Sequence, residues 1–218
     1  MGANHCAQQC CTADAAQCES PVLALQAAFK GTNESPGDIF VARLYREPQV
    51  LMGLRVDTND GRTAHIVYVL PEGLARRYND AACEDEQLEP GQYIVEVNGI
   101  SGDSAAMLKA IEESSVVTMR VSKAITFELF VARKPGEQLG LFFAYESMSQ
   151  SLIVREIREG PIARHNRTAP PGRAVLVYDR VLQVNSVDSG ALALLAELGA
   201  SPIVTLTFSR PFKAIARC

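Results

Sequence analysis

The chain of 218 residues has no tryptophan, only three histidines and an aromatic content of 6%. So few histidines leave little material for a histidine-based catalytic or metal centre. The sequence also has no G-x-S-x-G elbow, no phosphate-binding loop and no H-E-x-x-H helix. The acidic run at 84–86 is typical of a solvated loop rather than a metal site. We therefore expect no catalysis, no metal and no cofactor.

A strong charge of one sign and long apolar runs are also missing. The net charge is -4 with both signs interspersed, unlike the basic footprint of a nucleic-acid-binding protein. No apolar stretch approaches the ~18 residues of a membrane-spanning helix, and no secretory signal opens the sequence. Most cysteines crowd into the first 20 residues, whereas a disulfide framework would spread them through the fold. These absences predict a cytoplasmic location and no nucleic-acid partner.

What the sequence does contain is an internal repeat with a constant offset of 87 positions. Without a gap, Phe40 aligns with Phe127, and the pair Gly53-Leu54 aligns with Gly140-Leu141. Further identities cluster in the same way, at Arg46 and Arg133, Glu72-Gly73 and Glu159-Gly160, Asn79 and Asn166, Val97-Asn98 and Val184-Asn185, and Val117-Thr118 and Val204-Thr205. Because missed repeats mis-assign a fold, we interpret the chain as one module that occurs twice.

Each copy alternates strand-like and helix-like segments in the order β-β-β-α-β-α-β. Residues 38–46 and 125–133 are rich in β-branched and aromatic residues, which is typical of strands. Helical stretches precede the closing strand of each copy, at 104–113 and 191–199. The predicted class is α+β and β-rich. We expect a leader with a short helix at 1–37, modules at 38–123 and 124–210, and a tail at 211–218. A connection of only three residues, 122–124, favours a fixed orientation of the two modules.

Both copies resemble PDZ domains in the animal-type strand order. The resemblance rests on the loops Leu51–Leu54 and Gln138–Leu141, on the helix start at Gly160-Pro161, and on the segments LEPGQYIVEVNG and VYDRVLQVNS. It departs from the family signature at Gln92, and at Tyr178 and Ser186 where the family has glycine. The resemblance implies two small barrels or sandwiches in tandem, each of about five or six strands capped by two helices.

The resemblance also implies a peptide site in each copy. A glycine before a strand lets backbone N–H groups converge on a carboxylate, and an extended peptide adds to the open strand edge that follows. The second helix of each copy forms the facing wall. The expected peptide-binding residues are Leu51, Met52, Gly53, Leu54, Val56, Met107, Leu108 and Ile111 in the first copy, and Lys134, Gln138, Leu139, Gly140, Leu141, Phe143, Leu194, Leu195 and Leu198 in the second.

Charge near the loops separates the two copies. The family tends to place a basic residue before the loop, where this chain has Glu47 in the first copy and Lys134 in the second. Since a carboxylate is attracted by Lys134 and repelled by Glu47, the second copy is the expected peptide site. Neither copy has a histidine at the start of its second helix, so a preference for Ser or Thr in the ligand is unsupported. The expected function is a non-catalytic adaptor for C-terminal or internal peptide segments. The alternative is a membrane-associated scaffold that self-associates and has inert grooves.

The leader carries a partial acylation pattern. Met-Gly opens the sequence, with Cys6 where the myristoylation motif has Ser or Thr. Gly2 is thus a candidate for myristate, and Cys6, Cys10 and Cys11 for palmitate, which together would tether the chain to the cytoplasmic face of a membrane. An ordinary leader with incidental cysteines is a second interpretation. A metal cluster of His5, Cys6, Cys10, Cys11 and Cys18 is a third, although its spacing matches no common zinc pattern.

Overall fold

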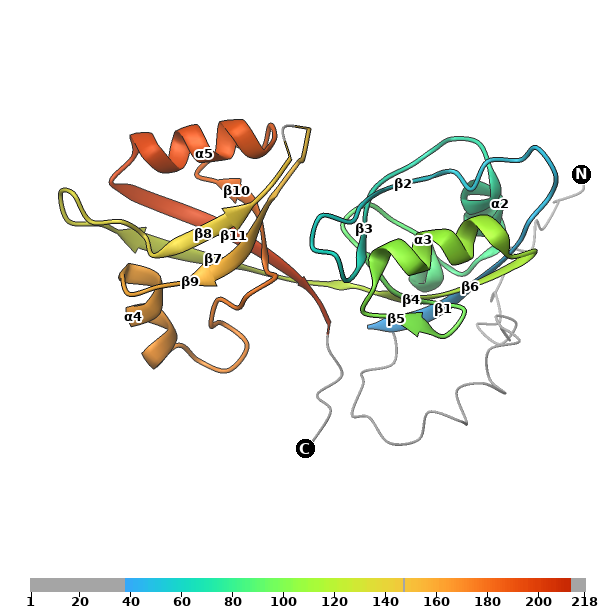
Figure 1. Ribbon diagram of the computed structural model, residues 1–218, viewed down its shortest axis with the longest axis horizontal. Coiled ribbons are helices and arrows are strands. Elements are labelled where there is room, and N and C mark those ends of the chain that lie inside the picture. The colour runs from blue at the N-terminus through green and yellow to red at the C-terminus, as the bar shows by residue number, and fades with distance from the viewer. Residues whose placement is uncertain (1–37, 147, 213–218) are drawn as a thin grey trace, which may run out of the picture. The chain divides into compact units, whose positions relative to one another are not determined.

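The computed structural model describes residues 38–146 and 148–212, which form two β-sheets accompanied by four α-helices (Figure 1). The expected leader, with its short helix and the acylation candidates Gly2, Cys6, Cys10 and Cys11, lies outside the described residues. Both sheets are antiparallel throughout. The α+β, β-rich class predicted from the sequence is confirmed.

The first module contains six strands and two α-helices. Its sheet has the order β1-β6-β4-β3-β2, and a short β5 pairs with β4. The elements in chain order are β1 (Ile39–Tyr45), β2 (Leu54–Asp57), β3 (Ala64–Val69), α2 (Leu74–Ala81), the 3-10 turn η2 (Glu84–Glu86), β4 (Tyr93–Val97), β5 (Ile100–Ser101), α3 (Ser104–Glu113) and β6 (Val116–Ser122).

The second module repeats this plan with five strands. Its sheet has the order β7-β11-β10-β9-β8, which places β8 at one edge just as β2 stands at one edge of the first sheet. The elements are β7 (Ala124–Ala132), β8 (Leu141–Ala144), β9 (Leu152–Ile157), α4 (Pro161–Thr168), β10 (Arg180–Val184), α5 (Ala191–Ala200) and β11 (Ile203–Pro211). Only Lys123 separates β6 from β7, and the order β-β-β-α-β-α-β is the predicted one.

Each module has its own apolar core, because the alternation along its strands buries one face of the sheet. Phe40, Ala42 and Leu44 alternate inward on β1, and Phe127, Leu129 and Val131 do the same on β7. The second helices cover these cores with Met107 and Leu194, both fully buried. None of the described helices is both long and apolar enough to pass through a membrane.

Residues that are identical in the two copies perform the same structural task in each. Arg46 donates to the carbonyl oxygens of Ile111 and Glu112, at 2.6 and 2.7 Å, at the C-terminal end of α3. Arg133 binds the end of α5 in the same way through the carbonyls of Leu198 and Ser201. These contacts satisfy terminal carbonyls that lack partners inside the helix and thereby hold the second helix of each module in place.

Candidate functional site

The loop before β2 has its carbonyl groups bonded inward. The carbonyls of Leu51, Met52 and Gly53 accept from the N–H groups of Leu74, Ala75 and Leu70, at 3.0, 2.9 and 2.8 Å. In contrast, the N–H groups of Met52 and Gly53 have no hydrogen-bond acceptor among the described residues. Since every backbone N–H is an obligatory donor, this loop offers neighbouring donors to a ligand.

The second module has the same arrangement before β8. The carbonyl of Leu139 accepts from the N–H of Ile162 at 3.3 Å, and that of Gly140 accepts from Arg158 at 2.8 Å. In the described part of the chain, the N–H groups of Leu139 and Gly140 have no acceptor. Convergent backbone donors of this kind form an anion-binding nest.

Glycine is required at the centre of both loops. Gly53 and Gly140 share a φ of 79°, in the left-handed region. A Cβ at Gly53 would lie 2.6 Å from the carbonyl oxygen of Glu72, and a Cβ at Gly140 would lie 2.6 Å from that of Arg158. Any side chain would therefore push the loop off the segment that follows β3 or β9 and would misplace the donors.

The strands that follow these loops have an open edge. Among the described residues, β2 pairs only with β3, and β8 pairs only with β9. The outer edge of each strand thus presents N–H and C=O groups to which another extended segment can bond. The N–H nest and the open edge adjoin each other in both modules.

The predicted apolar residues divide into exposed, half-buried and core positions. Leu51 is 71% exposed, whereas Met107 and Leu194 are fully buried and so support the helices from beneath rather than present a surface. Gly53, Leu139, Gly140 and Leu198 are also buried, while Lys134 and Gln138 are exposed. The half-buried residues that pack against the core of their module are Met52, Leu54, Val56, Ile111, Leu141, Phe143 and Leu195. Leu108 is also half-buried.

An arginine of the first helix binds a glutamate beside the loop in each module. Arg77 donates twice to the Glu47 carboxylate, at 2.9 and 2.8 Å. Arg164, at the equivalent position, lies 2.7 Å from the Glu137 carboxylate. The N–H of Lys134, followed by Arg164, lowers the pKa of Glu137. Because Arg77 neutralises Glu47, the first loop is not the repulsive site that the sequence suggests.

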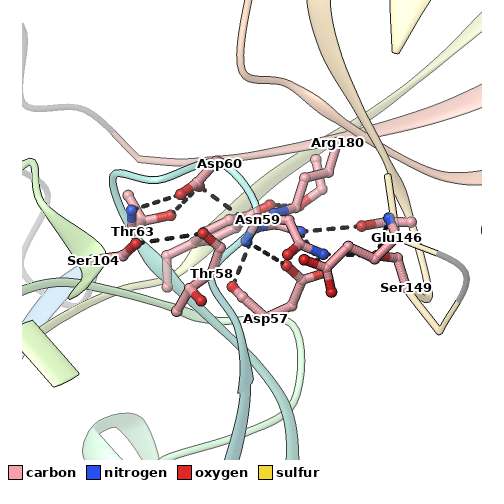
Figure 2. A network of polar contacts seen from close by, with 12 residues as sticks. Asp57, Thr58, Asn59, Asp60, Thr63, Ser104, Glu146, Ser149 and Arg180 are labelled. Carbon is pink, nitrogen blue, oxygen red and sulfur yellow. Dashed lines mark hydrogen bonds and ion pairs between the residues drawn. The ribbon is translucent and has the colours of Figure 1, made fainter. Parts of the chain in front are cut away.

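The two modules also contact each other through a buried arginine that sequence reasoning missed (Figure 2). Arg180 on β10 is completely buried, with a nitrogen 2.9 Å from Asp57 Oδ2 and another 3.5 Å from Asp60 Oδ2. Arg180 also donates to Ser151 Oγ at 3.1 Å and to the Asp57 carbonyl at 3.2 Å. A buried charge is tolerable only when paired and hydrogen-bonded, and here the partners come from both modules.

Further contacts surround this arginine. Asn59 donates to Ser149 Oγ at 2.7 Å, and the hydroxyls of Tyr93 and Ser209 lie 2.9 Å apart. Burial raises the pKa of Tyr93 to about 12. The rings of His65 and Tyr93 are tilted by 47° with their centroids 4.7 Å apart. Burial, followed by the nearby Arg180 charge, lowers the pKa of His65 to about 4. Tyr93 and Arg180 occupy equivalent positions in the repeat but differ in chemistry. The interface therefore uses residues that the two modules do not share.

The chemical groups beside the two loops can be described for the part of the chain that the structure covers. Within 38–146 and 148–212, no group of three or more His, Cys, Asp or Glu residues could hold a metal ion. The groups that converge at the loops are backbone N–H donors and apolar side chains. Backbone N–H groups in this position can donate hydrogen bonds to an anion, and an open strand edge can pair with an extended segment.

Solved structures similar to this chain include two of INAD PDZ45, one in complex with an NG2 peptide and one with NORPA CC-PBM. The first is 16% identical with a TM-score of 0.35 and covers 85% of this chain and 96% of its own. The second is 16% identical with a TM-score of 0.36 and covers 84% and 97%. A choanoflagellate SHANK1 PDZ domain bound to a GIRK3 peptide is 19% identical with a TM-score of 0.34 and covers 42% and 98%. No protein-family model and no curated protein matches the sequence.

Proposed function

We propose that this chain is a non-catalytic interaction protein that binds peptide C-termini by strand addition, mainly through its second module. The observation that carries the proposal is the loop geometry at Leu139 and Gly140, whose carbonyls are bonded inward while their N–H groups have no acceptor among the described residues. A peptide carboxylate would accept from these N–H groups, and the preceding peptide residues would extend along β8.

The expected affinity follows from the contacts available. A neutral backbone hydrogen bond contributes about 0.5–1.5 kcal/mol net, and one to a charged group about 1.5–3 kcal/mol. The peptide can make two hydrogen bonds through its carboxylate and two or three along the strand, and it can place one apolar side chain against Leu195. The summed free energy of these contacts exceeds the free-energy cost of association only modestly. The peptide affinity should therefore be micromolar, about -8 kcal/mol.

Charge alone favours the second module only slightly. The Glu47–Arg77 pair leaves the first loop neutral, whereas Lys134 adds one positive charge beside the paired Glu137 and Arg164. A single charge about 8 Å away in water contributes about 0.5 kcal/mol before salt screening. This amounts to about a twofold preference.

The edge of β2 supplies a second reason to expect peptide binding mainly at the second module. The carbonyl of Asp57, the last residue of β2, already accepts from Arg180 at 3.2 Å. Among the described residues, no side chain donates to the carbonyls of β8. One carbonyl of β2 therefore already binds a side chain, whereas those of β8 bind none among the described residues.

A matched pair of variants tests the proposal. Leu195 and Leu108 are equivalent half-buried positions on α5 and α3. A C-terminal peptide selected from a randomised library should bind the full chain, and the same peptide with an amidated end should bind at least tenfold more weakly, because the carboxylate is lost. Leu195→Glu should abolish binding, while Leu108→Glu should leave it unchanged.

Other outcomes would revise or reject the proposal. Loss of binding in Leu108→Glu alone would move the site to the first module. A library without a saturable ligand, together with concentration-dependent self-association, would favour the assembly module over the adaptor. Equal affinity for the acid and amide peptides would remove the proposed role of the N–H nest.

Membrane tethering and a cytoplasmic location stay part of this proposal. Acylation at Gly2, Cys6, Cys10 or Cys11 would place the peptide site at a membrane surface, since two acyl chains anchor stably and one only marginally. Intact mass of the chain expressed in animal cells tests this. A mass that shows removal of Met1 without an acyl increment would reject tethering by acylation.

A further inference from the structure

A cavity of about 300 Å³ is lined by residues of both modules, and none of its lining residues belongs to β2 or β8. The first module contributes the β2–β3 turn with Arg62 and Thr63, and the second contributes the segment 176–178 that precedes β10. Leu176, Val177 and Tyr178 are 45%, 43% and 36% exposed, so they give the cavity an accessible apolar wall. Such a volume is at the lower end of the range of small-molecule sites, which occur preferentially at domain interfaces.

Tyr178 adopts a backbone conformation that is costly for its residue type. Its φ is 75°, in the left-handed region, which tyrosine rarely occupies. The equivalent residue of the first module is Gly91, whose φ is 92°, so the repeat places glycine where this backbone is free of strain. The second module keeps the conformation and adds a ring. Residues with a strained backbone cluster at ligand sites. The φ of Tyr178 therefore motivates a functional hypothesis for this cavity.

The Tyr178 ring contacts two guanidinium groups, of which that of Arg62 belongs to the cavity lining. The Arg62 Cζ lies 4.8 Å from the ring centroid, and the Arg155 Cζ lies 5.5 Å from it. These are cation–π distances. Tyr178 thus orients Arg62, which comes from the other module.

The two carboxylates that line the cavity, Asp60 and Asp179, already have hydrogen-bond and ion-pair partners. The guanidinium of Arg62 differs from them. Asp60 accepts from the N–H groups of Arg62 and Thr63 at 2.7 and 2.8 Å, and it also lies near Arg180. Asp179 accepts from Arg210 at 2.7 Å. The guanidinium of Arg62 makes no ion pair within the described residues, and its contact is the Tyr178 ring. A cation beside an apolar wall suits an anion that has an apolar body.

We propose that this cavity binds a small organic carboxylate with an aliphatic or aromatic body. The carboxylate pairs with Arg62, and the hydrocarbon lies against Leu176 and Val177. This site is separate from the peptide grooves and uses residues of both modules. Ligand binding would therefore also strengthen the contact between the modules, because the ligand binds only where both walls are present.

Octanoate is a suitable probe, with acetate and 1-octanol as controls for the missing apolar body and the missing charge. Amide chemical shifts of the full chain should change saturably at residues 62 and 176–178 on addition of octanoate. Acetate and 1-octanol should bind at least tenfold more weakly, because each lacks one half of the recognition.

Variants assign the binding to named groups. Arg62→Gln should weaken octanoate binding at least tenfold, while Arg43→Gln, an exposed arginine on β1, should leave it unchanged. Tyr178→Gly should also weaken binding. Because glycine adopts this backbone without strain, the variant should fold at least as stably as the parent, which separates lost binding from misfolding.

Several results would overturn the proposal. These are the absence of saturable binding up to about 10 mM octanoate, equal affinity for 1-octanol, and unchanged affinity in Arg62→Gln. Octanoate-induced shifts confined to β2 or β8 would place the carboxylate in a peptide groove instead. The peptide-binding test uses Leu195→Glu, which does not touch this cavity, so the two proposals fail independently.

Discussion

Replacing His65 by leucine should remove a loss of stability on acidification that the parent chain shows. His65 is 8% exposed, and its Nε2 has no hydrogen-bond partner among the described residues. Burial, followed by the nearby Arg180 charge, lowers the pKa of His65 from 6.5 to about 4. The equivalent residue of the second module is the fully buried Leu152, so leucine is a side chain that this fold accepts there.

The sign and size follow from the two pKa values. Between pH 6.5 and 4 the unfolded chain binds a proton at His65 that the folded chain does not bind, so stability falls as the pH falls through this window. Above pH 6.5 the residue is neutral in both states and contributes nothing. From pH 7.5 to pH 5 the cost is about 2 kcal/mol for a folded-state pKa of about 4.

Urea unfolding of the full chain, followed by circular dichroism at pH 7.5 and pH 5, measures this effect. The parent should lose about 2 kcal/mol more than His65→Leu between the two pH values. His165→Gln keeps His65 and should keep the loss. An identical loss in the parent and in His65→Leu would refute the reasoning, because it would show that His65 takes up its proton as readily in the folded chain as in the unfolded one.

Three further substitutions test other parts of the structure by the same unfolding assay. Arg180→Leu should cost about 3–5 kcal/mol, because it leaves buried carboxylates unpaired, and adding Asp57→Asn and Asp60→Asn should recover part of it; a cost below about 1 kcal/mol would contradict the burial of this cluster. Gly140→Ala should cost more than about 2 kcal/mol and impair peptide binding, since its Cβ would lie 2.6 Å from a carbonyl. Gly136→Ala is its control, with a φ of 77° but open space around the Cβ, and equal costs would rule out the clash. Asn166→Ala should cost about 2 kcal/mol, because it removes two 2.8 Å bonds to the backbone of Val175, and Asn166→Asp, which keeps the acceptor, should cost less.

The repeat made much of the fold predictable. Several residues that are identical at positions 87 apart make their contacts within one module. Such an identity therefore indicates that the two modules share the same local geometry. Asn79 bonds the backbone of Leu88 in the way that Asn166 bonds Val175. Gly53 and Gly140 share one backbone conformation. Strand order and helix positions follow from such local constraints and from alternation along each strand.

The charges around the loops were only partly predictable. Glu47 has an unfavourable sign for a carboxylate site, and the sequence gives no indication that Arg77, 30 positions away, neutralises it. Burial of Met107 and Leu194 depends on the rotation of each helix about its axis, which the apolar pattern alone leaves open because neighbouring positions are also apolar. Tertiary contacts determine both the pairing of Glu47 with Arg77 and the rotation of each second helix.

The contact between the modules could not be predicted, because it rests on residues that differ between the copies. Position 93 is tyrosine and its equivalent is Arg180; position 91 is glycine and its equivalent is Tyr178. Arg180 enters the first module and Tyr178 orients Arg62. This contact is heterologous, because the β2–β3 turn of the first module faces β10 and the segment before it in the second. The residues that make this contact are thus ones that differ between the copies. A chain with the module order reversed should lose both the Arg180 cluster and the cavity while keeping each module folded.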